Sequence, residues 1–257
     1  MSRSVKTVED LLRMLDSLFS SQADRWTDRG SDWWDSFYSD RDRGVPFFRP
    51  VPDESLVAWH QNGLLEVPVG GRVLDVGCGP GRNSIWLAKQ GYQVDALDLS
   101  PMALKWGREL AHEAGVEVNF VRTNIFDWDI PDTKYDLIYD SGCFHHLPPH
   151  RRISYLSLLD RSLAPRSSFG LACFAVGGMG SEAPDTTFYI ERKLFGGLAY
   201  TDDDLRSMFG SLTEIDLRFM HQMPIDSDMF GESFLWEGPS AAQLNTIDTK
   251  RVHVSAL

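Results

Sequence analysis

Three glycines at alternate positions follow a short apolar stretch and are well suited to contact a ligand. They are Gly77, Gly79 and Gly81, within the segment VLDVGCGPGRNS at residues 73–84. Glycine has no Cβ atom, so it tolerates unusual dihedral angles and lets a ligand approach the main chain. The helix expected next presents free N–H groups in its first turn, where Asn83 lies. The pattern predicts a nucleotide-type site, and a tight turn without a ligand is the alternative interpretation.

Two acidic residues near the glycines restrict the kind of ligand. Asp98 ends the next expected strand, 17 residues after Gly81, where an acid accepts both hydroxyls of a ribose. Asp75 lies two residues before Gly77, where its charge would repel a pyrophosphate and attract a cation. The glycine spacing also differs from the G-x-G-x-x-G pattern of dinucleotide sites. These features favour a nucleoside ligand that carries positive charge.

A third group of candidates lies in the segment CFHHLPPH, at residues 143–150. His145 or His146 is a candidate general base, because imidazole titrates near neutral pH; support of the loop is the alternative role. Cys143 is expected beside the acceptor, where a small buried cysteine without a chemical role is the alternative. Asp140 and the three histidines are potential metal ligands, but two prolines separate them and no second cluster supports them. We therefore predict no metal site.

An aromatic-rich segment, residues 25–50, precedes the glycines and shows no strand pattern. We expect its rings to form a lid that excludes water and packs against a flat or apolar substrate. The core of a helical extension is the alternative interpretation. The rings of this lid are Trp26, Trp33, Trp34, Phe37, Tyr38, Phe47 and Phe48. Among them Trp33, Trp34, Phe47 and Phe48 are expected in the substrate wall, with His221 and Tyr189 as weaker candidates.

Alternating strand and helix patterns must position these residues. Strands are expected at residues 72–77, 93–99, 117–123, 135–141 and 168–176, and helices at 83–89, 101–111 and 151–163. Two later segments, 213–221 and 232–237, are further strand candidates. This alternation predicts an α/β fold: a Rossmann-like, doubly wound sheet with helices on both faces and ligands at its carboxyl edge.

The chain divides into three expected parts. Residues 1–70 form a helical, aromatic-rich N-terminal cap, residues 71–237 form the α/β domain, and residues 238–257 form a polar tail without a pattern. The length of 257 residues suits one large α/β domain with a cap. A hydrophobic content of 42% is enough for a sizeable core.

Charge and cysteine content restrict partners and location. The net charge of −12 disfavours nucleic acid and anionic membrane, because both repel an acidic protein. The three cysteines show no C-x-x-C spacing and fit a reducing compartment. The sequence lacks a signal-peptide pattern and any apolar run near the roughly 20 residues of a membrane span. We expect a cytoplasmic monomer or homodimer.

The segments VLDVGCGPGRNS and DALDLS (95–100) resemble the glycine motif and acidic loop of class I S-adenosylmethionine-dependent methyltransferases. YDLIYDSGCFHHLPPHRR (135–152) is similar to the fourth strand and following loop of the same superfamily. The likeness covers residues 71–174, and WWDSFYSDRDRGVPFF (33–48) resembles the cap of thiopurine and thiol methyltransferases. The resemblance implies S-adenosylmethionine as cofactor and a mostly parallel sheet with an antiparallel C-terminal strand.

The resemblance also assigns the methionine part and the ribose of the cofactor to residues of this chain. The methionine part faces Asp75 and the backbone from Gly77 through Cys78 to Gly79. The ribose hydroxyls bind to Asp98. Asp140, at the end of the fourth strand, lies near the methionine amine and the methyl group.

The adenine is assigned by the same resemblance to residues after the second and third strands. Leu99 packs against the ring, and Asn124 and Ile125 read its edge. Asn124 stands where the family commonly has Asp, so its amide accepts a hydrogen bond without charge assistance. Asp127 is a rival for this role.

We therefore expect an enzyme that transfers a methyl group from S-adenosylmethionine to an O, N or S atom of a small aromatic or apolar molecule. A histidine base would favour a hydroxyl or a ring nitrogen, and a thiol-type cap would favour sulfur. Two alternatives remain open: a nicotinamide-dependent oxidoreductase on a Rossmann sheet, and a non-catalytic module that binds S-adenosylmethionine.

Overall fold

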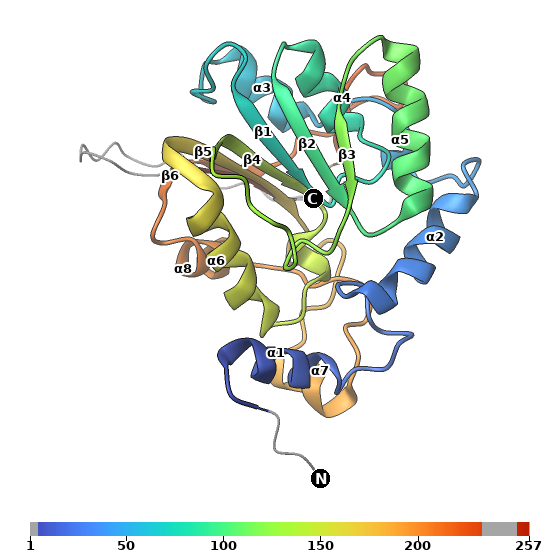
Figure 1. Ribbon diagram of the computed structural model, residues 1–257, viewed down its shortest axis with the longest axis vertical. Coiled ribbons are helices and arrows are strands. Elements are labelled where there is room, and N and C mark those ends of the chain that lie inside the picture. Colours follow the sequence, from blue (N-terminus) through green and yellow to red (C-terminus); the bar gives the residue numbers. More distant parts are fainter. Residues whose placement is uncertain (1–4, 233–250, 257) are drawn as a thin grey trace.

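The computed structural model describes residues 5–232 and 251–256 of the chain. Its strands are β1 (Arg72–Val76), β2 (Gln93–Asp98), β3 (Asn119–Arg122), β4 (Tyr135–Ser141), β5 (Leu163–Cys173), β6 (Thr213–Phe219) and β7 (Arg251–Ala256). They form one sheet of seven strands in the order β3-β2-β1-β4-β5-β7-β6. The expected Rossmann-like α/β fold is confirmed, and the strand order reverses between β1 and β4 (Figure 1).

The helices cover both faces of this sheet. They are α1 (Val8–Asp16), α2 (Ser31–Ser39), α3 (Glu54–Gln61), α4 (Arg82–Lys89), α5 (Pro101–Ala114), α6 (Arg151–Ser162), α7 (Asp185–Glu191) and α8 (Asp202–Met208), with 3-10 turns η1 (Asp28–Gly30), η2 (Pro46–Phe48) and η3 (Phe144–His146). None of the helices in these described ranges is long and apolar enough to cross a bilayer.

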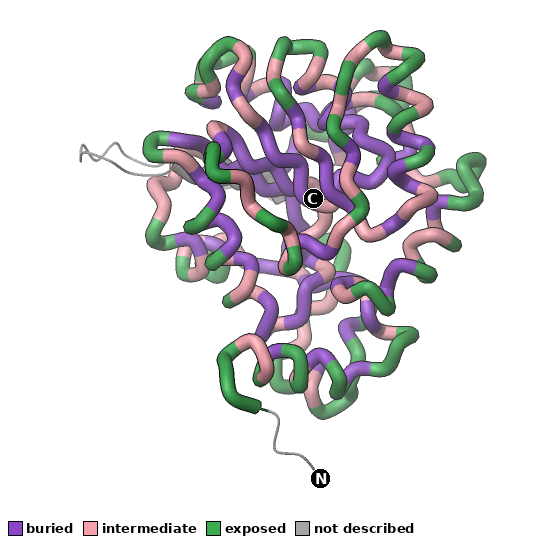
Figure 2. Tube along the Cα trace, viewed as in Figure 1, coloured by how far each residue is buried: buried purple, intermediate pink, exposed green. Residues whose placement is uncertain are grey.

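Successive residues of β1 supply the two layers of the core. Val73 packs with Trp59 of α3 and Leu87 of α4 on one face of the sheet. Leu74 belongs to the cluster on the other face, which includes Tyr155 of α6. This alternation follows from the two-residue period of a strand. Figure 2 shows the buried residues concentrated along the strands.

The orientation of the last strand differs from the expected antiparallel one. β7 pairs in parallel with β5 on one side and with β6 on the other. A parallel neighbour requires a crossover connection of a dozen or more residues, and residues 220–250 between β6 and β7 provide that length. The prediction of an antiparallel last strand was therefore wrong. The connection is long enough for the chain to cross back, so that β7 starts at the same end of the sheet as β6.

The C-terminal segments also differ from their sequence patterns. Residues 251–256 form β7, although the tail from residue 238 showed no strand pattern. The other late strand candidate, residues 232–237, lies outside the described residues apart from Glu232. The candidate at residues 213–221 is confirmed as β6.

Helices α1 and α2 lie toward the carboxyl end of the sheet, on the side to which the strands point (Figure 1). Asp35 of α2 accepts hydrogen bonds from Ser100 Oγ at 2.5 Å and from the Met102 N–H at 3.1 Å, at the start of α5. Tyr38 and Phe48 pack with Trp106 of α5. The cap is therefore attached to the sheet beside the turn that follows β2. Its boundary at residue 70 stays a proposal, since α3 shares the core of the sheet.

Candidate active site

A cavity of about 430 Å3 lies between the N-terminal cap and the carboxyl ends of the strands. This volume is within the range of about 300–1,000 Å3 that is typical of small-molecule sites. Its walls come from the ends of β1, β2 and β4, from the segments after β3 and β5, and from cap residues 25–47. The site therefore occupies the place where the strand order reverses, as expected for an open α/β sheet.

The glycine segment forms the floor of this cavity, and Gly77 and Gly79 line it. Gly77 has φ of +68°, and a Cβ atom there would lie 2.6 Å from the Cβ atom of Cys143. Both the backbone angle and the lack of space therefore require glycine. Gly81 does not line the cavity. It precedes α4 with φ of +75° and packs against the ring of Phe120 instead.

Two buried carboxyl groups face the cavity from the ends of β1 and β2. Asp75 accepts a hydrogen bond from Ser84 Oγ at 2.5 Å, and burial raises the pKa of Asp75 to about 7. Asp98 accepts hydrogen bonds from the N–H groups of Gly79 at 2.9 Å and Ser100 at 2.8 Å. Burial raises the pKa of Asp98 to about 6. A cationic ligand would favour the charged form of both groups.

The segment after β3 contributes Asn124 and Ile125, and Leu99 lines the cavity beside them. The Asn124 side chain is already engaged within the protein. Its Nδ2 donates to the carbonyl oxygen of Trp26 at 3.3 Å, and its Oδ1 accepts from the N–H of Phe126 at 3.0 Å. Asp127 does not line the cavity and pairs with Arg13 at 3.0 Å.

The two histidines after β4 both line the cavity, but they present different atoms. His145 Nδ1 accepts a hydrogen bond from the N–H of Phe174 at 3.3 Å, so the neutral ring carries its proton on Nε2. His146 Nδ1 contacts the carbonyl oxygen of Gly196 at 3.1 Å, so this nitrogen donates and Nε2 keeps a free lone pair. His146 is therefore the histidine able to accept a proton, and His145 is able to donate a hydrogen bond.

Both imidazoles are neutral at pH 7. Burial lowers the pKa of His145 well below its usual value. Burial lowers the pKa of His146 to about 4, and the nearby Arg25 contributes in the same direction. Cys143 also lines the cavity, and burial together with Asp140 raises the pKa of its thiol. This thiol is therefore protonated and is a poor nucleophile.

The aromatic cap supplies some of the expected rings and not others. Trp34 and Phe47 line the cavity. Trp33 does not; it is 39% exposed and stacks on Phe37. Phe48 is buried in the core between the cap and α5. Trp33 and Phe48 therefore lie off the cavity, because neighbouring residues on a short helix or turn face different sides.

His221 also lies off the cavity. The backbone N–H of His221 donates to Glu54 Oε1, and the His221 side chain is 67% exposed. Tyr189, the other weaker candidate, does not line the cavity either, and its Oη accepts from the His150 N–H at 3.0 Å.

Known proteins match a part of the chain that includes the glycine segment and the histidine loop but not the cap. The family described as a methyltransferase domain matches residues 73–166. A 2-heptyl-1-hydroxyquinolin-4(1H)-one methyltransferase of Mycobacteroides abscessus is 32% identical over 107 residues, which cover 41% of this chain and 47% of that protein. An uncharacterised methyltransferase of Schizosaccharomyces pombe is 30% identical over 103 residues, which cover 40% of this chain and 71% of that protein. This chain belongs to the class I S-adenosylmethionine-dependent methyltransferases.

A solved structure shares the fold of this methyltransferase. The magnesium protoporphyrin IX methyltransferase of Synechocystis PCC 6803, with bound S-adenosylhomocysteine, aligns with a TM-score of 0.51 and 22% identity, covering 70% of this chain and 85% of that chain. The chain spans about half the length of the first curated relatives that it matches. Family membership sets aside the nicotinamide-dependent oxidoreductase.

The features at the cavity floor fit the cofactor of this methyltransferase family. The bare backbone at Gly77 leaves space for a ligand against the main chain, and the two acids lack an ion-pair partner among the residues that the structure describes. The amine and the sulfonium of S-adenosylmethionine would supply positive charge there. In residues 5–232 no group of three His, Cys, Asp or Glu side chains is arranged to hold a metal ion.

Asp140 differs from its expected role in the methyltransferase. It is fully buried and does not line the cavity. Its carboxylate accepts hydrogen bonds from the N–H groups of Cys143 at 2.8 Å and Phe144 at 3.1 Å, and from Tyr155 Oη at 2.7 Å. Asp140 therefore supports the loop that carries the histidines, away from the cavity in which the methionine amine was expected.

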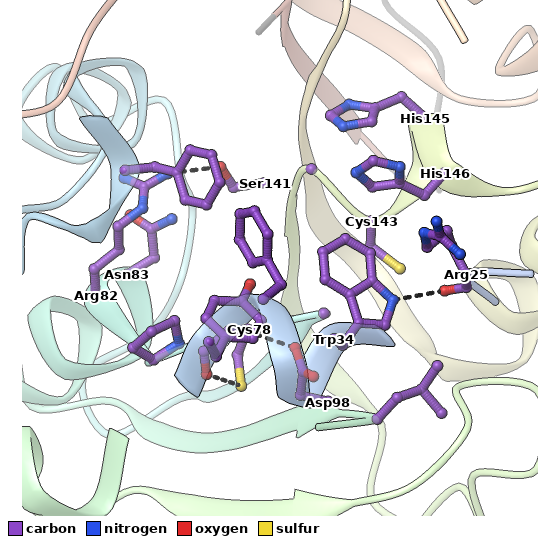
Figure 3. Close-up of a pocket in the computed structure, with 18 of the residues that line it drawn as sticks. Arg25, Trp34, Cys78, Arg82, Asn83, Asp98, Ser141, Cys143, His145 and His146 are labelled. Atoms are coloured by element: carbon purple, nitrogen blue, oxygen red, sulfur yellow. Dashed lines mark hydrogen bonds between the residues drawn. The ribbon is translucent and has the colours of Figure 1, made fainter. Parts of the chain in front are cut away.

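Several lining residues of the methyltransferase were missed by the sequence reasoning. They include Arg25, Arg82, Ser141 and Phe174. The position of Phe174 directly after β5 was a usable signal, since ligands bind beyond the carboxyl ends of strands. Arg82 directly follows Gly81 and forms an ion pair with Asp53 at 2.6 Å. Arg25 had no sequence signal, because only folding brings it beside His146 (Figure 3).

Proposed function

We propose that this methyltransferase transfers the methyl group of S-adenosylmethionine to a small, flat and largely apolar molecule in the cavity. The observation that carries the proposal is the difference in chemistry between the two sides of the cavity. Its floor has two buried carboxyl groups beside a bare glycine backbone, and the opposite wall has aromatic rings and two neutral histidines. The net charge of −12 supports a small molecule as the acceptor rather than nucleic acid.

In this proposal the floor of the cavity binds the cofactor. Asp75 and the backbone of Gly77, Cys78 and Gly79 hold the methionine part, together with Asn83 from the start of α4. Asp98 accepts the ribose hydroxyls, and Leu99, Asn124 and Ile125 enclose the adenine. The Asn124 side chain is committed to Trp26 and Phe126, so backbone groups of this segment are left to read the adenine edge.

S-adenosylmethionine supplies a methyl group that is already activated for displacement. The protein then has to align the acceptor atom with the carbon–sulfur bond and exclude water. His146 Nε2 carries the lone pair that is available to the methyl acceptor. A base with a pKa of about 4 is too weak to deprotonate a phenol with a pKa of about 10. An acceptor that needs no strong base, such as an ionised group or a nitrogen with a free lone pair, fits this wall best.

The named relative supports a flat acceptor. The M. abscessus protein is named for a methyl transfer to a hydroxyquinolinone, a planar ring system with a hydroxyl group. Trp34, Phe47 and Phe174 offer ring faces and edges for such a molecule. Whether oxygen, nitrogen or sulfur is methylated stays open in this proposal.

The first test is calorimetric titration of the purified protein with S-adenosylmethionine and S-adenosylhomocysteine. Asp98→Ala should weaken both affinities about 100-fold, since two charge-assisted hydrogen bonds are lost. Asp132→Ala, at an exposed position away from the cavity, is the matched control. A normal unfolding transition of Asp98→Ala would show that the change is confined to the site.

A turnover assay distinguishes an active methyltransferase from a module that only binds the cofactor. Release of S-adenosylhomocysteine with a panel of small phenols, N-hydroxyl compounds, heterocycles and thiols is expected for at least one acceptor. Cofactor binding without release by any acceptor would indicate a non-catalytic module. Absence of cofactor binding at millimolar concentration would overturn the proposal.

A further inference from the structure

Among the described residues, two arginines line the cavity, and they differ in their partners. Arg82 is neutralised by Asp53, with Nη1 and Oδ1 2.6 Å apart. Arg25 has no carboxylate oxygen within 4.0 Å of its guanidinium among the described residues. Its sequence neighbour Asp24 is committed elsewhere: its carboxylate pairs with Arg29 at 2.9 Å and accepts from the Thr27 N–H at 2.9 Å.

The Arg25 side chain is held in place without an anion. Its Nη1 donates to the carbonyl oxygens of Gln22 at 2.7 Å and Asp24 at 2.8 Å. Its guanidinium carbon lies 3.9 Å from the centre of a Trp33 ring, a cation–π contact. Its own carbonyl oxygen accepts a hydrogen bond from Trp34 Nε1 at 2.9 Å. Backbone and side chain are therefore fixed before any ligand binds.

The Arg25 guanidinium lies beside the polar side chains of the cavity wall that faces the glycine floor. Figure 3 shows Arg25 next to His146 and Cys143, on the opposite side of the cavity from Arg82. Burial lowers the pKa of Arg25, which means that the charged form is partly desolvated. A partly buried cation without a carboxylate partner is stabilised when a ligand supplies the opposite charge.

We infer that the acceptor carries an anionic group, such as a carboxylate or an ionised acidic hydroxyl, and that Arg25 binds this group. Arg25 offers the planar pair of N–H donors that suits an oxyanion, and His145 Nε2–H is a further donor on the same wall. The aromatic cap encloses the rest of the molecule, so the favoured class is a small aromatic acid. This inference rests on the proposed function, since it names the acceptor of that site.

The experiment compares an aromatic anion with its neutral counterpart. Protein saturated with S-adenosylhomocysteine is titrated at pH 7.5 with 2-naphthoate and with 2-naphthamide, and binding is followed by calorimetry. We expect 2-naphthoate to bind at least tenfold more tightly, a ratio typical of one charge-assisted hydrogen-bonded contact. Arg25→Gln should remove this preference, and Arg25→Lys should keep part of it.

Arg43→Gln is the matched control. Arg43 is an exposed arginine of the same cap that also lies over an aromatic ring, 4.9 Å from Phe37, but it does not line the cavity. This variant should retain the preference for naphthoate. Loss of the preference in both variants would point to the overall charge of the cap and would overturn the assignment to Arg25.

Other outcomes separate this inference from the proposed function. Equal affinity for naphthoate and naphthamide, or no binding of naphthoate at millimolar concentration, would overturn the inference while cofactor binding stands. A tenfold loss of S-adenosylhomocysteine affinity in Arg25→Gln would overturn it too, because Arg25 would then bind the cofactor. Failure of wild-type protein to bind S-adenosylhomocysteine would instead refute the proposed function, and the same pair of naphthyl probes would test the anion site in cofactor-free protein.

Discussion

Asp75 and Asp98 are acids whose charged forms are disfavoured until a cation arrives. Burial raises the pKa of Asp75 to about 7 and of Asp98 to about 6, above the usual value of 3.8. Between the usual pKa of 3.8 and these raised values, each carboxyl group therefore binds a proton more readily in the folded than in the unfolded protein. The stability that protonation adds is fully present below about pH 4 and is lost as pH rises through about 6 to 7.

This linkage predicts a pH-dependent response to the cofactor. The positive charges of S-adenosylmethionine favour the ionised acids, so its stabilising effect should increase as pH rises from about 5.5 to 8. Thermal unfolding measured with and without S-adenosylmethionine across this range checks it. Asp75→Asn should flatten the profile. A shift in melting temperature that is independent of pH would show that these carboxyl groups do not bind the cofactor as anions.

His145 and His146 differ in which ring nitrogen carries the proton. The sequence offered His145 and His146 as equal candidates, because adjacent imidazoles look alike in a motif. Their backbone partners distinguish them: the N–H of Phe174 fixes the proton of His145 on Nε2, and the carbonyl of Gly196 fixes that of His146 on Nδ1. Both partners are distant in sequence, so no local pattern could have assigned these roles.

At the scale of elements, a buried carboxylate fastens the cap to the α/β domain. Asp16, at the end of α1, accepts hydrogen bonds from Trp26 Nε1 at 2.7 Å and from Arg151 Nε at 3.1 Å, and contacts His150 Nε2 at 2.8 Å. Burial raises the pKa of Asp16, but these hydrogen bonds outweigh burial and lower it to about 2. Trp26 lines the cavity, so this contact connects the cavity wall to α6.

Asp16→Ala should therefore loosen the cap. It leaves Arg151 and His150 buried without their main partner, and the loss of one member of such a buried pair costs about 3–5 kcal/mol. Chemical denaturation measures the change in the free energy of unfolding. Arg41→Ala, which removes an exposed ion pair with Glu109, is the control and should cost less than about 1 kcal/mol. Similar losses in both variants would contradict a specific role for Asp16.

The lid hypothesis is tested by a ring that lines the cavity. Phe47→Ala should raise the acceptor KM more than the cofactor KM, because Phe47 lies on the cap side of the cavity. Steady-state kinetics with the acceptor found in the screen measures both constants. Phe195→Ala removes a ring of comparable exposure that does not line the cavity, and it should leave both unchanged. An equal rise of both constants in Phe47→Ala would argue against a lid.

At the scale of the whole molecule, β7 joins two parts of the sheet that are distant in sequence. It pairs with β5 and with β6, so its backbone hydrogen bonds hold the edge strand β6 in the sheet. Val254→Pro removes an N–H donor within β7 and should destabilise the protein by about 3 kcal/mol or more. Val69→Pro, at a fully exposed position outside the strands, is the control. A melting temperature of Val254→Pro equal to that of the control would contradict this role for β7.

The sequence by itself determined the fold class, the family and the floor of the site. The alternation of patterns is local, and so is the sequence of strand, glycine turn and helix from Arg72 to Lys89, so these features were predictable. Asp75, Gly77 and Asp98 reach the cavity because strand ends and tight turns fix their positions.

Only the tertiary structure decided the opposite wall and the last strand. Arg25 meets His146, Asp16 meets Arg151, and β7 enters between β5 and β6 through contacts across long stretches of chain. Asp140 turns away from the cavity because the loop N–H groups and Tyr155 bind it. Such contacts depend on how the elements pack, and the periodicity of a sequence does not encode which side chain of an adjacent pair, such as Trp33 and Trp34, faces the ligand.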